Sequence, residues 1–329
     1  MTSPIDGTRF ADDSFVPIAV ATRNEVDESL HHGVGVVVAP DGSIVRAVGD
    51  PELLVHPRSA LKPFQAAAMV DAGLELPPRL LAVVTASHSG EPAHLDAVLE
   101  ILARYDLTVD DLANTPDRPS GDAARSDARS AGVEPSPLQQ NCSGKHAGML
   151  ATCRINGWAT DSYLDPDHPL QELIADTIDR LAGRPGGSVA DTGVDGCGAP
   201  THVMPLVDVA RSLGVLARER SEVASAMAAE PFYVGGTDRD VTRWMEAVPG
   251  LVAKEGAAGV MVLALPDGRA AAAKVADGSE LARRAVTVEM LRRLGIDVDG
   301  ALAAVRDRVV VAVLGHGAPV GELTALPWT

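Results

Sequence analysis

Aromatic side chains and basic charge are both scarce in this chain of 329 residues. Aromatic residues make up only 3%, which argues against a base-stacking platform or a sugar-binding surface. Lys and Arg number 28 against 45 Asp and Glu, so the net charge is −17 and no basic stripe is available to displace counterions from a phosphate backbone. We therefore expect no nucleic-acid partner, and a soluble protein that handles small molecules.

Long apolar runs and paired cysteines are also lacking. No stretch of 18 consecutive apolar residues occurs, so no transmembrane helix is expected. The first residues, MTSPID, have neither the basic nor the apolar region of a signal peptide. The cysteines, Cys142, Cys153 and Cys197, are odd in number in a long chain, which does not indicate a disulfide framework. These features predict a cytoplasmic protein without membrane contact.

Lysine is rare even among the basic residues. Only four of the 28 are lysine, namely Lys62, Lys145, Lys254 and Lys274, and arginine supplies the remaining positive charge. A lysine can lose its proton when it is buried or crowded by positive charge, whereas an arginine effectively cannot. Each lysine is therefore a candidate for a function that arginine cannot perform. The alternative is that the four lysines are leftovers of a biased composition.

β-structure is predicted near both ends of the chain. Residues 33–48 contain two β-rich runs around a Pro-Asp-Gly turn at 40–42, and residues 259–275 repeat this pattern around 266–268. Both are strong hairpin signals. A further apolar run at 309–314 predicts another strand. Strands from both termini with helical patterns between them favour one antiparallel sheet around a helical insertion.

Helical spacing of apolar residues dominates the middle of the chain, where 110–136 is the exception and is expected to be a long surface loop. The fold class is thus α/β (α+β), with flanking helices and a helical subdomain. One domain is expected over 1–329, with sheet-forming parts at 15–55 and 248–329 and a helical part at 60–247. Helices are expected at 93–105, 170–181, 201–213, 219–229 and 279–294, the last with Ser279 as its N-cap.

One segment pairs a serine with a lysine, and two others hold a candidate serine and a candidate lysine separately. Ser59 and Lys62 stand at positions i and i+3, so a helix starting near Ser59 would place both on one face. A lysine with a lowered pKa can then act as the base for the hydroxyl. Ser87 lies in a cluster of small hydroxyl residues before a predicted helix, and Lys254 directly precedes the late hairpin. The alternatives are capping or turn serines with solvated lysines.

A third segment, 140–149, holds Cys142 and Lys145, and a distant one holds Cys197. Thiolates are soft ligands suited to zinc, but the usual Cys-x-x-Cys spacing is absent. Buried, inert cysteines are therefore the alternative. Cys153 lies among apolar residues and is expected in the core. Three histidines lie inside motifs and are candidates for hydrogen-bonding roles: His88, His146 and His202.

The complete motif strings resemble those of the rhizobial-type (class 3) L-asparaginases. In chain order, the Ser-x-x-Lys segment, a middle Ser/Cys/Asn segment and Lys-Glu-Gly at 254–256 also resemble the motifs of penicillin-recognising serine hydrolases and serine glutaminases. The resemblance to the asparaginases extends from about residue 15 to the end of the chain. It rests on HPRSALKPFQ (56–65), ASHSGEP (86–92), QNCSGKHAGM (140–149), VDGCGAP (194–200) and YVGGT (233–237).

This resemblance implies a fold like that of the serine β-lactamases and glutaminases, a homodimer, and hydrolysis of L-asparagine to L-aspartate and ammonia. It implies Ser59 as the nucleophile with Lys62 beside it, although which serine is acylated stays open, and Ser87 as a second serine paired with Lys254. The implied zinc ligands are Cys142, Lys145 and Cys197, with water at the open position. The implied substrate-binding residues are Arg58, His146 and Asp195.

Two other functions remain open. One is a glutaminase or another Ser-x-x-Lys amidase of the same fold, and the other is a catalytically silent amino-acid-binding protein. The role of the metal is open as well, since a zinc-bound water can attack the substrate or the ion can merely position it.

Overall fold

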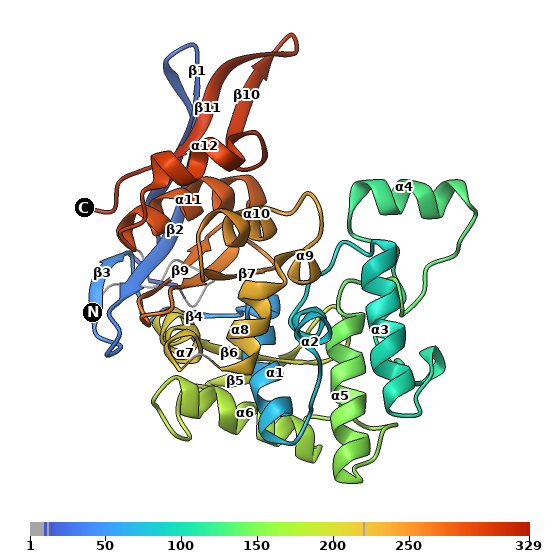
Figure 1. The fold of residues 1–329 in the computed structure, drawn as a ribbon. Helices are drawn as coiled ribbons and strands as arrows, with labels where there is room; N and C mark the ends of the chain where they lie inside the picture. The colour runs from blue at the N-terminus through green and yellow to red at the C-terminus, as the bar shows by residue number, and fades with distance from the viewer. Residues whose placement is uncertain (1–9, 12, 220) are drawn as a thin grey trace.

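The main element is an antiparallel sheet whose strands come from both ends of the chain (Figure 1). The structure, a computed structural model, describes residues 10–329 except 12 and 220. The strand order is β10-β11-β1-β2-β9-β8-β7, and β3 pairs with β2. The strands are β1 (Val16–Arg23), β2 (Val26–Val38), β3 (Ile44–Val48), β7 (Val252–Gly256), β8 (Val260–Ala264), β9 (Ala270–Val275), β10 (Val311–Gly315) and β11 (Ala318–Ala325).

Both predicted Pro-Asp-Gly hairpins are confirmed. The first joins β2 to β3 and the second joins β8 to β9, each as an antiparallel pair. All of β8 and nearly all of β9 are buried, because α7 (Leu206–Arg218) and α11 (Glu280–Arg293) both pack on these strands. β7 forms the edge of the sheet toward the helical part, so side chains on β7 can meet residues from the middle of the chain.

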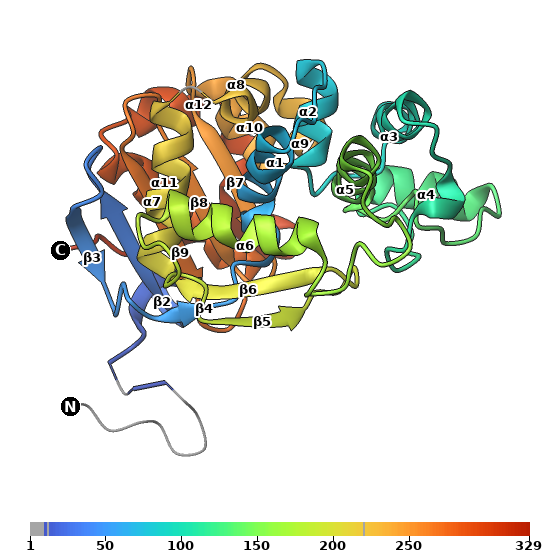
Figure 2. The ribbon, with the colours of Figure 1, turned by 90° about the horizontal axis from the view of Figure 1, so that it is seen from below.

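Helices fill most of the chain between the two sheet-forming ends, and Figure 2 shows α3, α4 and α5 on the side away from β2 and β3. The expected α+β fold is therefore confirmed, and so is the cap of α11, where Ser279 Oγ accepts from the Ala282 N–H. No helix among the described residues is long and apolar enough to cross a membrane. The other helices are η1 (Arg58–Leu61), α1 (Lys62–Asp71), α2 (Pro78–Val84), α3 (Pro92–Arg104), η2 (Val109–Asp111), α4 (Asp122–Ser130), α5 (Ser143–Asn156), α6 (Pro169–Leu181), α8 (Glu222–Ala229), α9 (Pro231–Val234), α10 (Asp240–Ala247) and α12 (Val298–Val309).

Three local expectations are wrong. The helix expected at 201–213 starts only at residue 206, because Pro200–Pro205 forms β6, the centre of a second sheet with β4 (Leu54–Val55) and β5 (Asp191–Val194). The expected loop at 110–136 contains α4, which buries no residue and is built from good helix formers such as Ala and Arg. The strand expected at 309–314 begins two residues later, since Val309 still ends α12.

Two glycines let backbone segments approach closely enough to assemble one site. A Cβ on Gly256 of β7 would lie 2.1 Å from the carbonyl oxygen of Pro57, so only glycine lets η1 pack on this edge strand. A Cβ on Gly144 of α5 would lie 2.2 Å from the Val83 carbonyl oxygen at the end of α2. The sheet edge, η1, the end of α2 and the start of α5 therefore meet at one place.

Candidate active site

The segment after α2 carries Ser87 and is held by backbone hydrogen bonds on both sides. The Ser87 N–H donates to the Val234 carbonyl (3.2 Å) and the Ser89 N–H donates to Gly235 (2.8 Å). Between them, the His88 N–H donates to the Asn141 carbonyl (3.1 Å). Because three successive N–H groups are anchored in this way, the Ser87 hydroxyl is fixed in the region where α1 and β7 meet.

Two lysines converge on the Ser87 hydroxyl. Lys254 Nζ donates to Ser87 Oγ at 3.0 Å, and Lys62 Nζ donates to the same oxygen at 3.2 Å. Ser87 is 4% exposed, Lys62 1% and Lys254 0%, so water hardly reaches the three groups. Burial, together with the positive charges of Lys62 and Arg239, lowers the pKa of Lys254 to about 8. The Lys254 amine thus loses its proton more readily than an ordinary lysine, and a minor fraction of it is neutral near neutral pH.

Ser59 lies at the outer end of this group. It is partly exposed, and its hydroxyl makes no hydrogen bond to a described residue, although its carbonyl accepts from the Lys62 N–H. The preceding Arg58 has a φ of 54°, a left-handed conformation that is uncommon outside glycine. Such strain is typical of functional sites and here turns the chain sharply into η1.

Arg58 and Asp195 form an ion pair beside Ser59. Arg58 Nε donates to Asp195 Oδ1 at 2.5 Å, and the Gly196 N–H donates to the same carboxylate at 2.8 Å. Burial acts to raise the pKa of Asp195, but Gly196, Lys145 and Arg58 outweigh it and keep that pKa below its usual value. The residue directly before Ser59 therefore carries a positive charge that is paired with a fixed negative one.

The two expected metal-binding thiols meet on the other side of Lys62. Lys145 Nζ donates to Cys197 Sγ at 3.2 Å, and both cysteines are buried. The pKa of Cys142 is well below its usual value because the Cys197 thiol hydrogen-bonds to it and because Lys62 and Lys145 lie nearby. The pKa of Lys145 is raised by the two cysteines in spite of its burial. Cys153, in contrast, lies in the hydrophobic core as expected.

The donor set formed by Cys142, Lys145 and Cys197 fits a soft metal ion. Two sulfur atoms and one amine nitrogen lie together, and a thiolate is favoured at Cys142, whereas the hydrogen bond with Cys142 and burial raise the pKa of Cys197. No group of three or more His, Cys, Asp and Glu suited to a metal occurs in the described part of the chain. Lys145 would therefore have to be the third protein ligand.

His146 is a neutral, buried histidine close to both lysines. Its Nδ1 lies 2.7 Å from the Tyr163 hydroxyl, which accepts from the Ala113 N–H and so donates to the ring. Burial, with the charges of Lys145 and Lys62, holds the pKa of His146 well below its usual value. The other ring nitrogen, Nε2, is buried and has no partner among the described residues. It can therefore donate to a ligand.

The structure also brings in residues that the sequence motifs did not single out. Glu255 is buried next to Lys254, with its Oε1 accepting from Arg239 Nη2 at 2.7 Å. In the sequence, Glu255 was the middle residue of the Lys-Glu-Gly motif but was given no role of its own. Of the other two motif histidines, His88 contacts Ser143 Oγ (2.9 Å), whereas His202 contacts Thr192 Oγ1 (3.0 Å) between β5 and β6.

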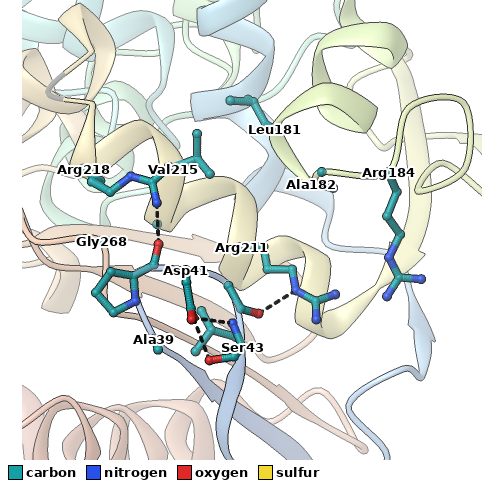
Figure 3. Close-up of a pocket in the computed structure, with 15 residues that line it drawn as sticks. Ala39, Asp41, Ser43, Leu181, Ala182, Arg184, Arg211, Val215, Arg218 and Gly268 are labelled. Atoms are coloured by element: carbon teal, nitrogen blue, oxygen red, sulfur yellow. Dashed lines mark hydrogen bonds between the residues drawn. The ribbon is translucent and has the colours of Figure 1, made fainter.

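A cavity of about 580 Å³ shares no lining residue with this site (Figure 3). It lies between the first hairpin turn, the end of α6 and α7, and three arginines line it. Arg211 donates to the Gly42 carbonyl and pairs with the buried Asp208, which also pairs with Arg184. Arg218 donates to the Pro40 carbonyl. We call this the arginine pocket.

Comparison with known proteins now adds the family. The family model described as L-asparaginase II matches residues 19–325. No curated protein matches the sequence. Among solved structures, a β-lactamase from Mycobacterium bovis is 15% identical, with a TM-score of 0.41 over 74% of this chain and 86% of that chain. Mglu in its native form is 16% identical, with a TM-score of 0.40 over 83% of this chain and 62% of that chain. Both structures are distant, and this chain spans less than two thirds of Mglu.

Proposed function

Because the chain belongs to the L-asparaginase II family and is an amidohydrolase, we propose that it hydrolyses L-asparagine to L-aspartate and ammonia through a Ser–Lys nucleophile. One observation carries the proposal. Ser59, which is partly exposed, lies in η1 directly before Lys62, and Lys62, Ser87 and Lys254 form a buried, hydrogen-bonded chain of amines and hydroxyl. The cytoplasmic location and the homodimer stay predictions.

Accessibility favours Ser59 over Ser87 as the nucleophile. A nucleophile must touch the substrate carbon, but the Ser87 hydroxyl is buried and already accepts two hydrogen bonds from lysines. Ser59 is partly exposed, and its hydroxyl is free of hydrogen bonds to the described residues. Ser87 then serves best as a bridge between the two amines, across which a proton can move.

The reaction follows from these positions. Ser59 Oγ forms a bond to the side-chain amide carbon, and its proton passes to the amine of Lys62. Lys62 is joined to Lys254 through the Ser87 hydroxyl, so this chain can return a proton to the amide nitrogen as the C–N bond breaks and ammonia leaves. Water then cleaves the β-aspartyl ester and restores the Ser59 hydroxyl.

The charged pair beside Ser59 suits the backbone end of an amino acid. The Arg58 guanidinium would bind the α-carboxylate and the Asp195 carboxylate would bind the α-ammonium. The unpartnered Nε2 of His146 would donate a hydrogen bond to the substrate. These three residues select a zwitterion and thereby direct the side-chain amide toward the serine.

We also propose a zinc ion held by Cys142, Lys145 and Cys197. Lys145 would bind as the neutral amine, which explains why arginine does not replace it. When bound, the ion would supply positive charge that stabilises negative charge on the substrate. Because zinc binding requires loss of protons from the thiols and the amine, its affinity would fall as the pH is lowered.

Ammonia release from a substrate panel tests the function. The purified protein should release ammonia from L-asparagine, more slowly from L-glutamine, and leave a chromogenic β-lactam intact. Ser59→Ala should abolish turnover while keeping the fold, since a hydroxyl at a helix start contributes only about 1 kcal/mol. Preference for glutamine would favour the glutaminase alternative, and no turnover of any amide would favour a binding protein. Normal turnover by Ser59→Ala would mean that Ser87, and not Ser59, is the nucleophile.

A further inference from the structure

Glu255 is a buried carboxylate that the mechanism above leaves unused. It is 4% exposed, and its Oε1 lies 2.7 Å from Arg239 Nη2 and 3.4 Å from Lys254 Nζ. Its Oε2 is buried without a partner among the described residues. A buried charge with one unpaired oxygen is costly, so its position beside a proton-carrying lysine calls for a function.

Glu255 holds Lys254 at two points. The Lys254 amine donates to the main-chain carbonyl of Glu255 at 2.8 Å, and the carboxylate of the same residue lies on its other side. The third group around the amine is Ser87, whose Oγ accepts a hydrogen bond from Lys254. Two hydrogen-bond acceptors and the more distant carboxylate thus surround the amine and hold the direction of the lysine side chain.

The charged groups around Lys254 come from four elements. Lys62 of α1 and Arg239, just before α10, disfavour a charge on the Lys254 amine, whereas Glu255 of β7 favours it. Glu255 in turn stays ionised, although it is buried, because Lys254, Arg239 and Arg283 of α11 hold its pKa down against the charge of Asp240 in α10. Within the described part of the chain, Glu255 is thus the anion that opposes the effect of two cations, Lys62 and Arg239, on the pKa of Lys254.

We propose that Glu255 is a positioning residue, which directs the Lys254 amine at the Ser87 hydroxyl and sets how readily that amine carries a proton. The proposal rests on the proposed function, because it assigns Lys254 a part in amide hydrolysis. Glu255 itself touches no reacting atom and acts through the lysine. Arg239 moderates Glu255, since it shares the same carboxylate oxygen.

Two substitutions should shift the pKa of Lys254 in opposite directions. Glu255→Gln keeps the shape and the hydrogen bond from Arg239 but removes the negative charge, so the pKa of Lys254 should fall further below its value of about 8. Arg239→Gln removes a cation and frees the carboxylate for Lys254, so the same pKa should rise. A purely structural contact would produce no such change of sign.

Nuclear magnetic resonance can follow Lys254 without relying on activity. With only four lysines, a protein labelled with ¹³C at lysine Cε should show four signals, and Lys254→Arg identifies one of them by its loss. In a pH titration the midpoint of Lys254 should fall by about one to three pH units in Glu255→Gln and rise in Arg239→Gln. Glu280→Gln, an exposed carboxylate at the start of α11, is the matched control and should leave it unchanged.

The pH profile of kcat/KM for asparagine is the second readout. The limb that reports Lys254 should move to lower pH in Glu255→Gln and to higher pH in Arg239→Gln, whichever protonation state the reaction needs. Unmoved midpoints, or shifts of the same sign in both variants, would overturn the proposal. If Glu255→Gln does not fold, Arg239→Gln decides alone, and a midpoint that fails to rise rejects it. A wild-type protein that releases no ammonia contradicts the proposed function, while the titration still tests Glu255.

Discussion

The arginine pocket and the lysine site show two ways of placing positive charge in one acidic chain. In the arginine pocket, Arg184 and Arg211 are matched by an acid. Arg218 donates to a carbonyl of the hairpin turn (Figure 3). In the lysine site, Lys62 and Lys254 are buried around a single neutral hydroxyl, and among the described residues only the carboxylate of Glu255 pairs with Lys254.

This difference distinguishes charges that hold parts of the fold together from charges that we propose to take part in the reaction. Arginines that bind carboxylates and carbonyls hold the first hairpin turn and α7 together, and none of them needs to lose a proton. Amines that are buried close to one another cannot all stay charged, so their protons become exchangeable. The cavity of about 580 Å³ is therefore a pocket whose arginines are paired, whereas the proposed chemistry lies where the charges are incompletely paired.

The largest expected effect is at the two amines on Ser87. Lys62→Arg and Lys254→Arg keep a positive charge but remove the exchangeable proton, so each should lower kcat/KM for asparagine at least about a hundredfold. Lys274→Arg is the control, because Lys274 only donates to the carbonyls of Ala258 and Val275, and it should remain within about twofold of wild type. Near-wild-type turnover of all three Lys→Arg variants would rule out the Ser–Lys mechanism.

An intermediate effect is expected on metal content. The protein purified without chelators should hold about one zinc per chain by elemental analysis, and Cys142→Ser should lose it because a hydroxyl is a poor substitute for a thiolate. Cys153→Ser, in the core, should keep the metal even though it loses some stability. A metal-free wild-type protein would contradict the zinc site.

The smallest effect is expected in the arginine pocket. Arg218→Gln loses the charge and weakens one hydrogen bond to the Pro40 carbonyl, which should cost at most about 1 kcal/mol of unfolding free energy. Asparagine turnover should stay at the wild-type level, measured beside chemical denaturation. A tenfold loss of turnover would show that the two regions are coupled and would end the distinction between them.

Local patterns predicted those parts of the fold that local chemistry specifies. The Pro-Asp-Gly turns define both hairpins, and Ser279 caps α11 as its position indicates. The strand at 200–205 was missed because it is stabilised by pairing with other strands, of which β4 lies far away in the sequence and β5 is a short neighbouring strand. The exposed helix α4 was missed because it has no apolar face to reveal it.

The sequence predicted the individual residues of the candidate site, but not the hydrogen bonds that join them. The motifs indicated Ser59 with Lys62 and Ser87 with Lys254, whereas the structure also joins Lys62 to Ser87. Glu255 was not predicted, because a glutamate after a lysine reads as an ordinary exposed pair. Its burial depends on β7 lying at a sheet edge covered by α10 and η1.

By itself the sequence determined the residue types of the chemistry, namely the two serines, the scarce lysines and the cysteine pair, together with the turns and caps that local hydrogen bonding specifies. Only the tertiary structure decided which amines share a hydroxyl and which serine stays accessible. It also decided which carboxylate is buried with them. The physical reason is that burial and charge proximity set proton affinity, and both arise from contacts between segments far apart in the chain, such as Gly256 against Pro57.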